Sequence, residues 1–349
     1  MSLAVALKTH DLAELPSRRD EDWRWTDLRG LIRVLPPMSP AVDEVAVNAV
    51  LKDIQGTRIV FANGRALADG GVSVAAQGDT VVLRRFVSAS EGTAHHLEAP
   101  VVVGEGGRLL LIDSFEGQAG AYVSSAHSRV HLAAGASLER LVLLDDAADA
   151  ISIGLTEVEL SPGANLRQTV LASGAKRQRF ETRVSRHGGG AKVQLDGVYI
   201  LSGARHSDQT TEVLHETVDG STSQLTKGVV QDQARGVFQG RIVVAQGADQ
   251  TDARMGHHAL VLSDRAEVDA KPELLIYADD VACAHGNTVG ALDEEAMFYA
   301  RSRGIPEREA RDMLIQAFLH DVVDRIEHVQ ARELAAVWLA AHLIQGNAP

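Results

Sequence analysis

The sequence predicts a mainly β protein whose core is a right-handed parallel β-helix, or solenoid, with helical segments at both ends. Gly-containing turns recur in the middle of the chain between runs of β-branched and aliphatic residues. The marker glycines of these turns are 28, 28, 27, 30 and 27 residues apart. They are Gly107, Gly135, Gly163, Gly190, Gly220 and Gly247. A near-constant spacing in this range is typical of repeat architectures, in which each unit is one coil.

Two further observations favour stacked β coils. Within a unit the pattern alternates, as in Leu138-Glu139-Arg140-Leu141, and such alternation is typical of strands. Only 4% of residues are aromatic, whereas 45% are hydrophobic and 31 are glycines, a composition that suits small aliphatic side chains in close layers. An ordinary β-sandwich built from hairpins is the alternative, because the repeats share little outside their turns.

Residues 1–55 form an N-terminal segment whose apolar residues recur at helical intervals before Pro36-Pro37. These residues are Leu12, Leu15, Trp25, Leu28, Leu31 and Ile32. The β core is expected over residues 56–292. Near its start, Asn63-Gly64 follows a β-rich run and predicts a hairpin, because these residues adopt positive φ at little cost.

The C-terminal segment, residues 293–349, is predicted to be helical. Asp293 is a suitable N-cap, Gly304 stands where a first helix would stop, and Pro306 starts a second helix. Apolar residues at steps of 4, 3, 4 and 3 then form one stripe: Ile315, Leu319, Val322, Ile326 and Val329. This stripe is either a groove for a partner or a face that packs on the core.

Charge and cysteine content limit the classes of function. The chain has 34 basic and 47 acidic side chains and a net charge of −13, which argues against nucleic acid as the main partner. Cys283 is the only cysteine, so this chain alone builds no disulfide and no four-cysteine metal site. Without a membrane-spanning apolar run or a signal-peptide pattern, we expect a soluble cytoplasmic protein.

Cys283-Ala284-His285 is the best candidate site, since the sequence has no phosphate loop, serine-hydrolase elbow or zinc-protease motif. Residues two apart in a strand face the same side, so the thiol and the imidazole would share one face. Both groups are soft or borderline metal ligands. Two ligands do not close a site, however, and an isolated cysteine is commonly a small buried hydrophobe.

Further metal ligands would have to come from His257, His258 or a second chain. These two histidines are adjacent, so in a strand they face opposite ways, and one can be buried while the other is exposed. A pair of surface histidines is the simpler interpretation.

The sequence around the cysteine resembles the SufB/SufD family of iron–sulfur cluster assembly proteins. The resemblance is carried by Tyr277–Gly290 and by its continuation, Leu292–Ile305. The head of the chain, Pro16–Leu28, is similar to the opening of members of the SufD branch. Gly286, the short chain and the single cysteine favour that branch over SufB. The chain departs from the family pattern at His257-His258, where many relatives are rich in asparagine.

The resemblance implies a cytosolic complex in which this chain pairs with a SufB-like paralogue through the β-helices, and each holds one copy of the ATPase SufC. The ATPase would bind near the C-terminal helices, at about Ile305–Ile326. The contacts expected there are Ile315, Phe318, Leu319 and Val322. Nucleotide would bind to that partner and not to this chain. A homodimer of the isolated chain stays an open alternative.

The same resemblance implies roles for the candidate site. His285 matches the histidine thought to help hold a nascent iron–sulfur cluster at the subunit interface, and Cys283 matches a nearby cysteine. The expected function is a non-catalytic scaffold subunit that shares a transient cluster with a partner chain. Two alternatives are a β-helix enzyme acting on polysaccharide, which would show paired acidic residues along one face, and a solenoid that only docks partners.

Overall fold

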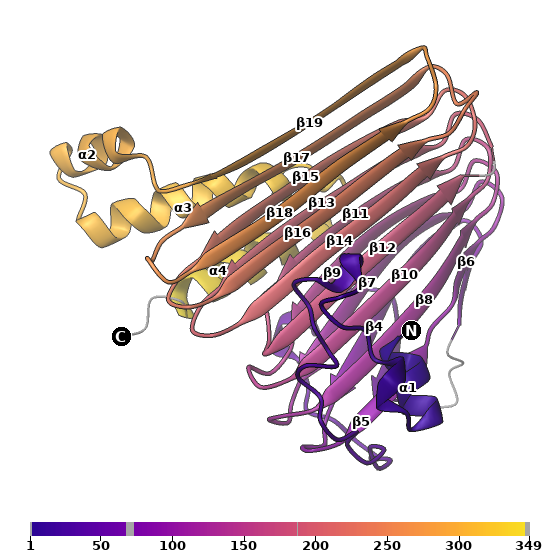
Figure 1. Ribbon diagram of the computed structural model, residues 1–349, viewed down its shortest axis with the longest axis horizontal. Helices are drawn as coiled ribbons and strands as arrows, with labels where there is room; N and C mark the ends of the chain where they lie inside the picture. Colours follow the sequence, from indigo (N-terminus) through magenta and orange to yellow (C-terminus); the bar gives the residue numbers. More distant parts are fainter. Residues whose placement is uncertain (1, 68–72, 187, 346–349) are drawn as a thin grey trace.

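The computed structural model describes residues 2–67, 73–186 and 188–345, which form a parallel β-solenoid of two sheets with helices at both ends (Figure 1). The first sheet has ten strands: β1 (Thr57–Ala62), β2 (Arg65–Ala66), β4 (Asp79–Ser88), β7 (Arg108–Gly117), β9 (Ser137–Asp145), β11 (Asn165–Ala172), β13 (Lys192–Leu201), β15 (Ser221–Val230), β17 (Thr251–Val261) and β19 (Val281–Gly290). The second sheet has nine strands: β3 (Val74–Ala76), β5 (Ala94–Glu98), β6 (Val101–Val103), β8 (Val123–Leu132), β10 (Ile151–Leu160), β12 (Arg177–Arg186), β14 (His206–His215), β16 (Arg235–Val244) and β18 (Glu267–Ile276).

Parallel pairing of neighbouring coils confirms the predicted solenoid, and the sandwich of hairpins is wrong. Among the described strands, only β1 and β2 pair in antiparallel fashion. They are joined through Asn63 and Gly64, whose φ values are 50° and 78°. Positive φ at both central residues is what a tight two-residue hairpin requires, so the predicted hairpin is confirmed.

The predicted glycine turns lie at one edge of the solenoid, where each strand of the second sheet leads into the first sheet. Four markers have φ values from 65° to 81°: Gly135, Gly163, Gly190 and Gly247. At the other two turns the positive-φ residue precedes the marker, as Gly106 and Asp219. Successive turns also bond to each other, since the Gly135 N–H donates to the Pro162 carbonyl at 3.0 Å. A residue with positive φ therefore recurs at each of these turns, and glycine supplies it at five of the six.

Small aliphatic side chains fill much of the space between the two sheets. Val130 and Leu160 from the second sheet join Leu138 and Leu166 from the first sheet in one buried cluster. Alternate residues of each strand face this interior, which explains the low aromatic content of the chain.

The C-terminal segment forms α2 (Glu294–Ser302), α3 (Glu307–Val323) and α4 (Val329–Gln345), as predicted in outline. Asp293 caps α2 by accepting hydrogen bonds from the Glu295 and Ala296 N–H groups at 2.8 and 3.1 Å. Pro306 is the N-cap of α3 rather than its first helical residue. None of the helices in the described ranges is long and apolar enough to cross a membrane.

The predicted apolar stripe is interrupted between α3 and α4. Ile326 lies in the connection and Val329 begins α4. The connection is held by the solenoid, because Arg325 Nε donates to Asp196 Oδ2 at 2.8 Å. Glu139 then caps the start of α4 by accepting from the backbone N–H groups of Glu327 and His328. These contacts end α3 where the apolar periodicity alone would continue the helix.

Helix α3 packs its apolar face on the outward side of the first sheet, as does α4 (Figure 1). Ile315, Leu319 and Val322 are buried there in a cluster that includes Val229 of β15. The prediction that these three side chains contact a partner directly is therefore corrected, because they face the chain's own core. Phe318 is half-buried, with the Lys227 ammonium 4.4 Å from its ring centroid.

The N-terminal segment is less helical than predicted. Its described helical elements are α1 (Leu3–Thr9) and the 3₁₀ turns η1 (Leu12–Glu14), η2 (Glu21–Trp23) and η3 (Ala49–Leu51). The stretch from Trp25 to Ile32 forms no helix. Instead, Leu28 and Ile32 are buried against Ile151 and Ile153 on the outer face of the second sheet. Burial on this distant surface overrides the local helical pattern.

Residues Pro16–Leu28 attach the N-terminal segment to the middle strands of the second sheet, β12 and β14. The Arg179 guanidinium lies 4.4 Å from the Trp23 ring centroid and donates to the Asp22 carbonyl at 2.7 Å. Thr26 donates to the buried carboxylate of Asp208 at 2.5 Å. The residues of Pro16–Leu28 that resembled a family signature therefore make structural contacts with the solenoid.

Candidate functional site

The candidate residues Cys283 and His285 lie on β19, the last strand of the first sheet (Figure 1). Strand β19 pairs with β17 on one side, and its other edge meets no strand of the described chain. Strand β18 ends the second sheet in the same way. We call these two unpaired edges the open end of the solenoid. Unpaired edges can add a strand from another chain.

The register of β19 against β17 shows which face the candidate side chains share. Cys283 lies opposite Ala253, and His285 lies opposite Met255. Ala253 and Met255 are buried inside their coil, so Cys283 and His285 also face the interior side of the last coil. Because β19 is the last strand, His285 is exposed, whereas Cys283 is half-buried against an apolar cluster.

Cys283 is a free thiol with a raised pKa. Burial is the main cause, and the charge of Asp252 acts in the same direction, whereas a backbone hydrogen bond from Ala253 opposes them. The thiolate is the form that binds a metal, so binding at Cys283 would release a proton.

The adjacent histidines point in opposite directions, as their alternation predicted. His257 is fully buried and His258 is half-exposed, so the interpretation of both as surface residues is wrong for His257. The His257 ring lies 2.7 Å from Asn287 Oδ1 through Nδ1 and 2.9 Å from the Tyr199 hydroxyl through Nε2. Burial is the main cause that lowers the pKa of His257 to about 4.

The structure does not assemble a complete metal site from these candidates. His258 Nδ1 faces outward and lies 2.7 Å from Thr288 Oγ1. Both ring nitrogens of His257 are engaged by other side chains. Within residues 2–67, 73–186 and 188–345, no group of three or more histidine, cysteine, aspartate or glutamate side chains has a metal-binding arrangement. Cys283 and His285 therefore remain a two-residue pair in this chain.

Sequence reasoning missed Asn287 and Tyr199, the two partners of His257. Asn287 follows His257 by 30 residues, close to one repeat, and the two residues are paired across β17 and β19. The Tyr199 ring occupies space left by two glycines, and a Cβ added at Gly228 would lie 1.9 Å from it. For the contact between His257 and Asn287, the signal in the sequence was their separation of 30 residues, which is close to one repeat.

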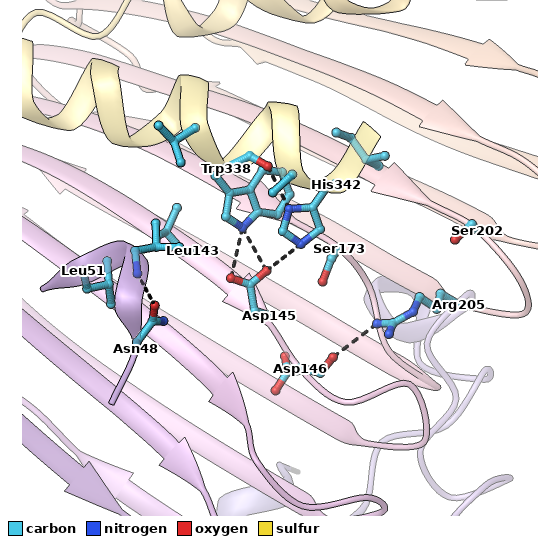
Figure 2. A pocket seen from close by; sticks show the side chains of 14 residues that line it. Asn48, Leu51, Leu143, Asp145, Asp146, Ser173, Ser202, Arg205, Trp338 and His342 are labelled. Atoms are coloured by element: carbon cyan, nitrogen blue, oxygen red, sulfur yellow. Dashed lines mark hydrogen bonds and ion pairs between the residues drawn. The ribbon is translucent and has the colours of Figure 1, made fainter. Parts of the chain in front are cut away.

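A groove of about 520 Å³ lies between α4 and the first sheet (Figure 2), and none of its lining residues belongs to β19. Trp338 Nε1 donates to Asp145 at 2.8 Å, and His342 Nε2 lies 3.1 Å from the same carboxylate. The Trp338 and His342 rings stack with centroids 3.8 Å apart. These polar groups bond mainly to one another, and they fasten α4 to the solenoid.

Charged side chains on the outward face of the second sheet form a cross-strand ladder. Six paired residues on successive strands alternate in charge: Arg129, Glu157, Arg183, Glu212, Arg241 and Glu273. Arg241 contacts Glu212 at 3.0 Å and Glu273 at 3.1 Å. The carboxylates of this row are matched with arginines, which stabilises the sheet. The row therefore differs from the paired acids expected of a polysaccharide-acting enzyme.

Comparisons with known proteins cover most of the chain. Residues 86–318 match the family described as "SUF system FeS cluster assembly, SufBD core domain". The chain is 33% identical to the iron–sulfur cluster assembly protein SufD of Escherichia coli, over 93% of this chain and 88% of that protein. It is 32% identical to an iron–sulfur cluster assembly SufBD family protein of Synechocystis, over 59% of this chain and 45% of that protein. SufD of Bacillus subtilis is 33% identical over 42% of this chain and 33% of its own length.

Proposed function

Because this chain belongs to the SufB/SufD family of iron–sulfur cluster assembly proteins and is SufD-like, we propose that it is a scaffold subunit holding part of a nascent cluster at its open end. The cluster is cargo and is shared with a second chain. One observation carries the proposal: His285 is exposed on the interior face of the last coil, two residues from the Cys283 thiol.

The chemistry of the pair suits a shared and transient site. Thiolate and imidazole both ligate iron in iron–sulfur proteins. Two ligands from this chain leave the remaining positions to a partner, so the cluster is complete only while the two chains are together. Separation of the chains would remove part of the ligand set and favour release of the cargo. Cys283 would lose its proton when the cluster forms.

A SufB-like paralogue is the proposed partner at the open end. Strands β18 and β19 offer unpaired backbone N–H and C=O groups to a second solenoid. Large apolar side chains are exposed on and beside the same strands: Leu275, Ile276, Tyr277 and Val289. Pairing there would cover these side chains and bring further ligands to Cys283 and His285.

A SufC-like ATPase is the proposed second partner, and we place its contact on the exposed face of α2 and α3. Helix α2 projects beyond the ends of the strands (Figure 1). Phe298, Tyr299 and Met313 are exposed on these helices and replace the buried stripe as candidate contacts. In this proposal the ATPase hydrolyses ATP in the cytoplasm, and this chain is not itself a catalyst.

We expect His285→Ala to lower the iron and sulfide bound to the purified complex of this chain with its SufB-like and ATPase partners by several-fold. The reason is the loss of one cluster ligand at the open end. His258→Ala is the matched control, because this neighbouring histidine lies on the opposite face of β17. Iron and sulfide are measured on the assembled complex after size-exclusion chromatography.

Equal iron and sulfide in wild-type and Cys283→Ser/His285→Ala complexes would refute the role of the pair. If that double variant also supported normal cluster delivery, the chain would act only as a docking solenoid.

A further inference from the structure

We propose that Asn287 is a third group of the cluster site, which donates a hydrogen bond to a cluster sulfur, and that His257 is a positioning residue for its amide. This inference rests on the proposed function. Asn287 lies two residues beyond His285 on β19 and pairs with the buried His257 of β17. Cys283, His285 and Asn287 therefore form one row on the interior face of the open end.

The hydrogen bonds of His257 define the orientation of the Asn287 amide. The amide oxygen Oδ1 only accepts, so His257 Nδ1 carries the proton and donates across 2.7 Å. In a neutral imidazole the other nitrogen accepts, and the Tyr199 hydroxyl donates to it across 2.9 Å. The direction of donation therefore runs from Tyr199 through His257 to Asn287.

We call these hydrogen bonds, from Tyr199 through His257 to Asn287, the relay. Packing in the solenoid interior fixes the position of its two rings. A Cβ added at Gly228 or Gly236 would lie 1.9 or 2.5 Å from the Tyr199 ring, so only glycine leaves room for that ring. The Phe238 ring is parallel to the His257 imidazole within 3°, with centroids 4.8 Å apart. The imidazole is thus fixed from two sides before it meets Asn287.

The fixed amide presents its donor group to the open end. With Oδ1 bound by His257, the planar amide directs Nδ2 away from that ring. Asn287 is exposed, and its Nδ2 has no hydrogen-bond partner within the described residues. Hydrogen bonds from N–H groups to cluster sulfurs are one of the means by which a protein sets the reduction potential of a cluster. An oriented and unoccupied amide beside two candidate ligands fits that role.

The donor role is tested in the complex with the SufB-like and ATPase partners, reconstituted with ferrous iron and sulfide. Asn287→Asp keeps an acceptor for His257 but has no N–H to donate, and Asn287→Ala has neither. We expect both variants to retain a cluster with a more negative reduction potential and an altered visible absorption band. His258→Ala, on the outward face, should leave both unchanged.

The positioning role is tested by a matched pair at His257. Gln offers an N–H group to Asn287 and should preserve the wild-type potential, whereas Leu offers none and should shift the potential as Asn287→Ala does. Nitrogen-15 spectra of the isolated chain should show protonated Nδ1 and unprotonated Nε2 in His257, a readout that needs no cluster and no partner.

Wild-type potential and absorption in both Asn287 variants would overturn the donor role. Unprotonated Nδ1 in His257 would overturn the positioning role. If His285→Ala complexes kept full iron and sulfide, the proposed function itself would be refuted. A His257 spectrum with protonated Nδ1 and unprotonated Nε2 would then show that the relay exists without a cluster site.

Discussion

One set of charged side chains is buried in the solenoid interior. Asp113 lies between Arg84 and Arg140, each 2.6 Å away. Burial alone would raise the pKa of Asp113, but the two guanidinium groups lower it. Removing one member of such a set leaves an uncompensated buried charge, which typically costs about 3–5 kcal/mol of stability.

Three buried histidines make stability depend on pH. Burial is the main cause that lowers the pKa of His95, His206 and His257 to about 4. In the unfolded chain their pKa is near 6.5, so the unfolded state binds more protons between pH 6.5 and 4. Stability should therefore be complete above pH 6.5 and fall toward pH 4, by roughly 3 kcal/mol for each histidine. Urea unfolding at a series of pH values measures this loss.

His206→Gln should flatten part of the pH profile, because Gln does not titrate. An unfolding midpoint that stays constant from pH 7.5 to pH 4.5 would contradict the assignment of neutral buried histidines.

Helix α3 has a buried face on the first sheet, whereas the proposed ATPase contact is an exposed surface of α2 and α3, and substitutions should separate the two. Leu319 is fully buried on the first sheet, so Leu319→Asp would bury an unpaired charge. This substitution should lower the free energy of unfolding by about 3 kcal/mol or more. Phe298 and Met313 are exposed, so Phe298→Asp and Met313→Glu should weaken ATPase binding while the melting temperature stays near that of the wild type. Co-purification and thermal unfolding measure the two effects.

Full co-purification of the ATPase with the Phe298→Asp/Met313→Glu variant would rule out this face as the contact. Loss of binding in Leu319→Asp alone would not identify a contact, because unfolding of α3 also removes it.

Across the whole molecule, negative charge is concentrated in the last two strands and in the segments that flank them. Residues 262–295 contain nine acidic and two basic side chains, a net charge of −7 within the total of −13. The acidic residues are Asp264, Glu267, Asp269, Glu273, Asp279, Asp280, Asp293, Glu294 and Glu295. Two copies of this chain meeting through their open ends would bring these charges together. A partner with a basic edge would meet no such repulsion.

Self-association of the isolated chain should therefore increase with salt, because screening weakens the repulsion between two acidic ends. Light scattering between 50 and 500 mM NaCl, about a threefold change in screening length, measures the effect. An Asp279→Lys/Asp280→Lys variant should associate at lower salt than the wild type. A dimer that dissociates as salt increases would contradict this electrostatic account.

Local signals in the chain were sufficient for the solenoid, its turn spacing, the Asn63-Gly64 hairpin and the Asp293 cap. Each depends on φ preferences or on hydrogen bonds within a few residues. In the solenoid the same turn conformation, with its positive-φ residue, recurs in successive coils. The shared face of Cys283 and His285 was predictable for the same reason, since alternation along one strand is local.

Contacts between distant residues settled the rest. Leu28 is buried against Ile153 instead of forming a helix, and Leu319 packs on the sheet instead of facing a partner. His257 is buried between Tyr199, which is 58 residues away, and Asn287, which is 30 residues away. The physical reason is that burial and hydrogen-bond satisfaction depend on which surfaces meet in three dimensions, and periodicity reports only which side chains share a face.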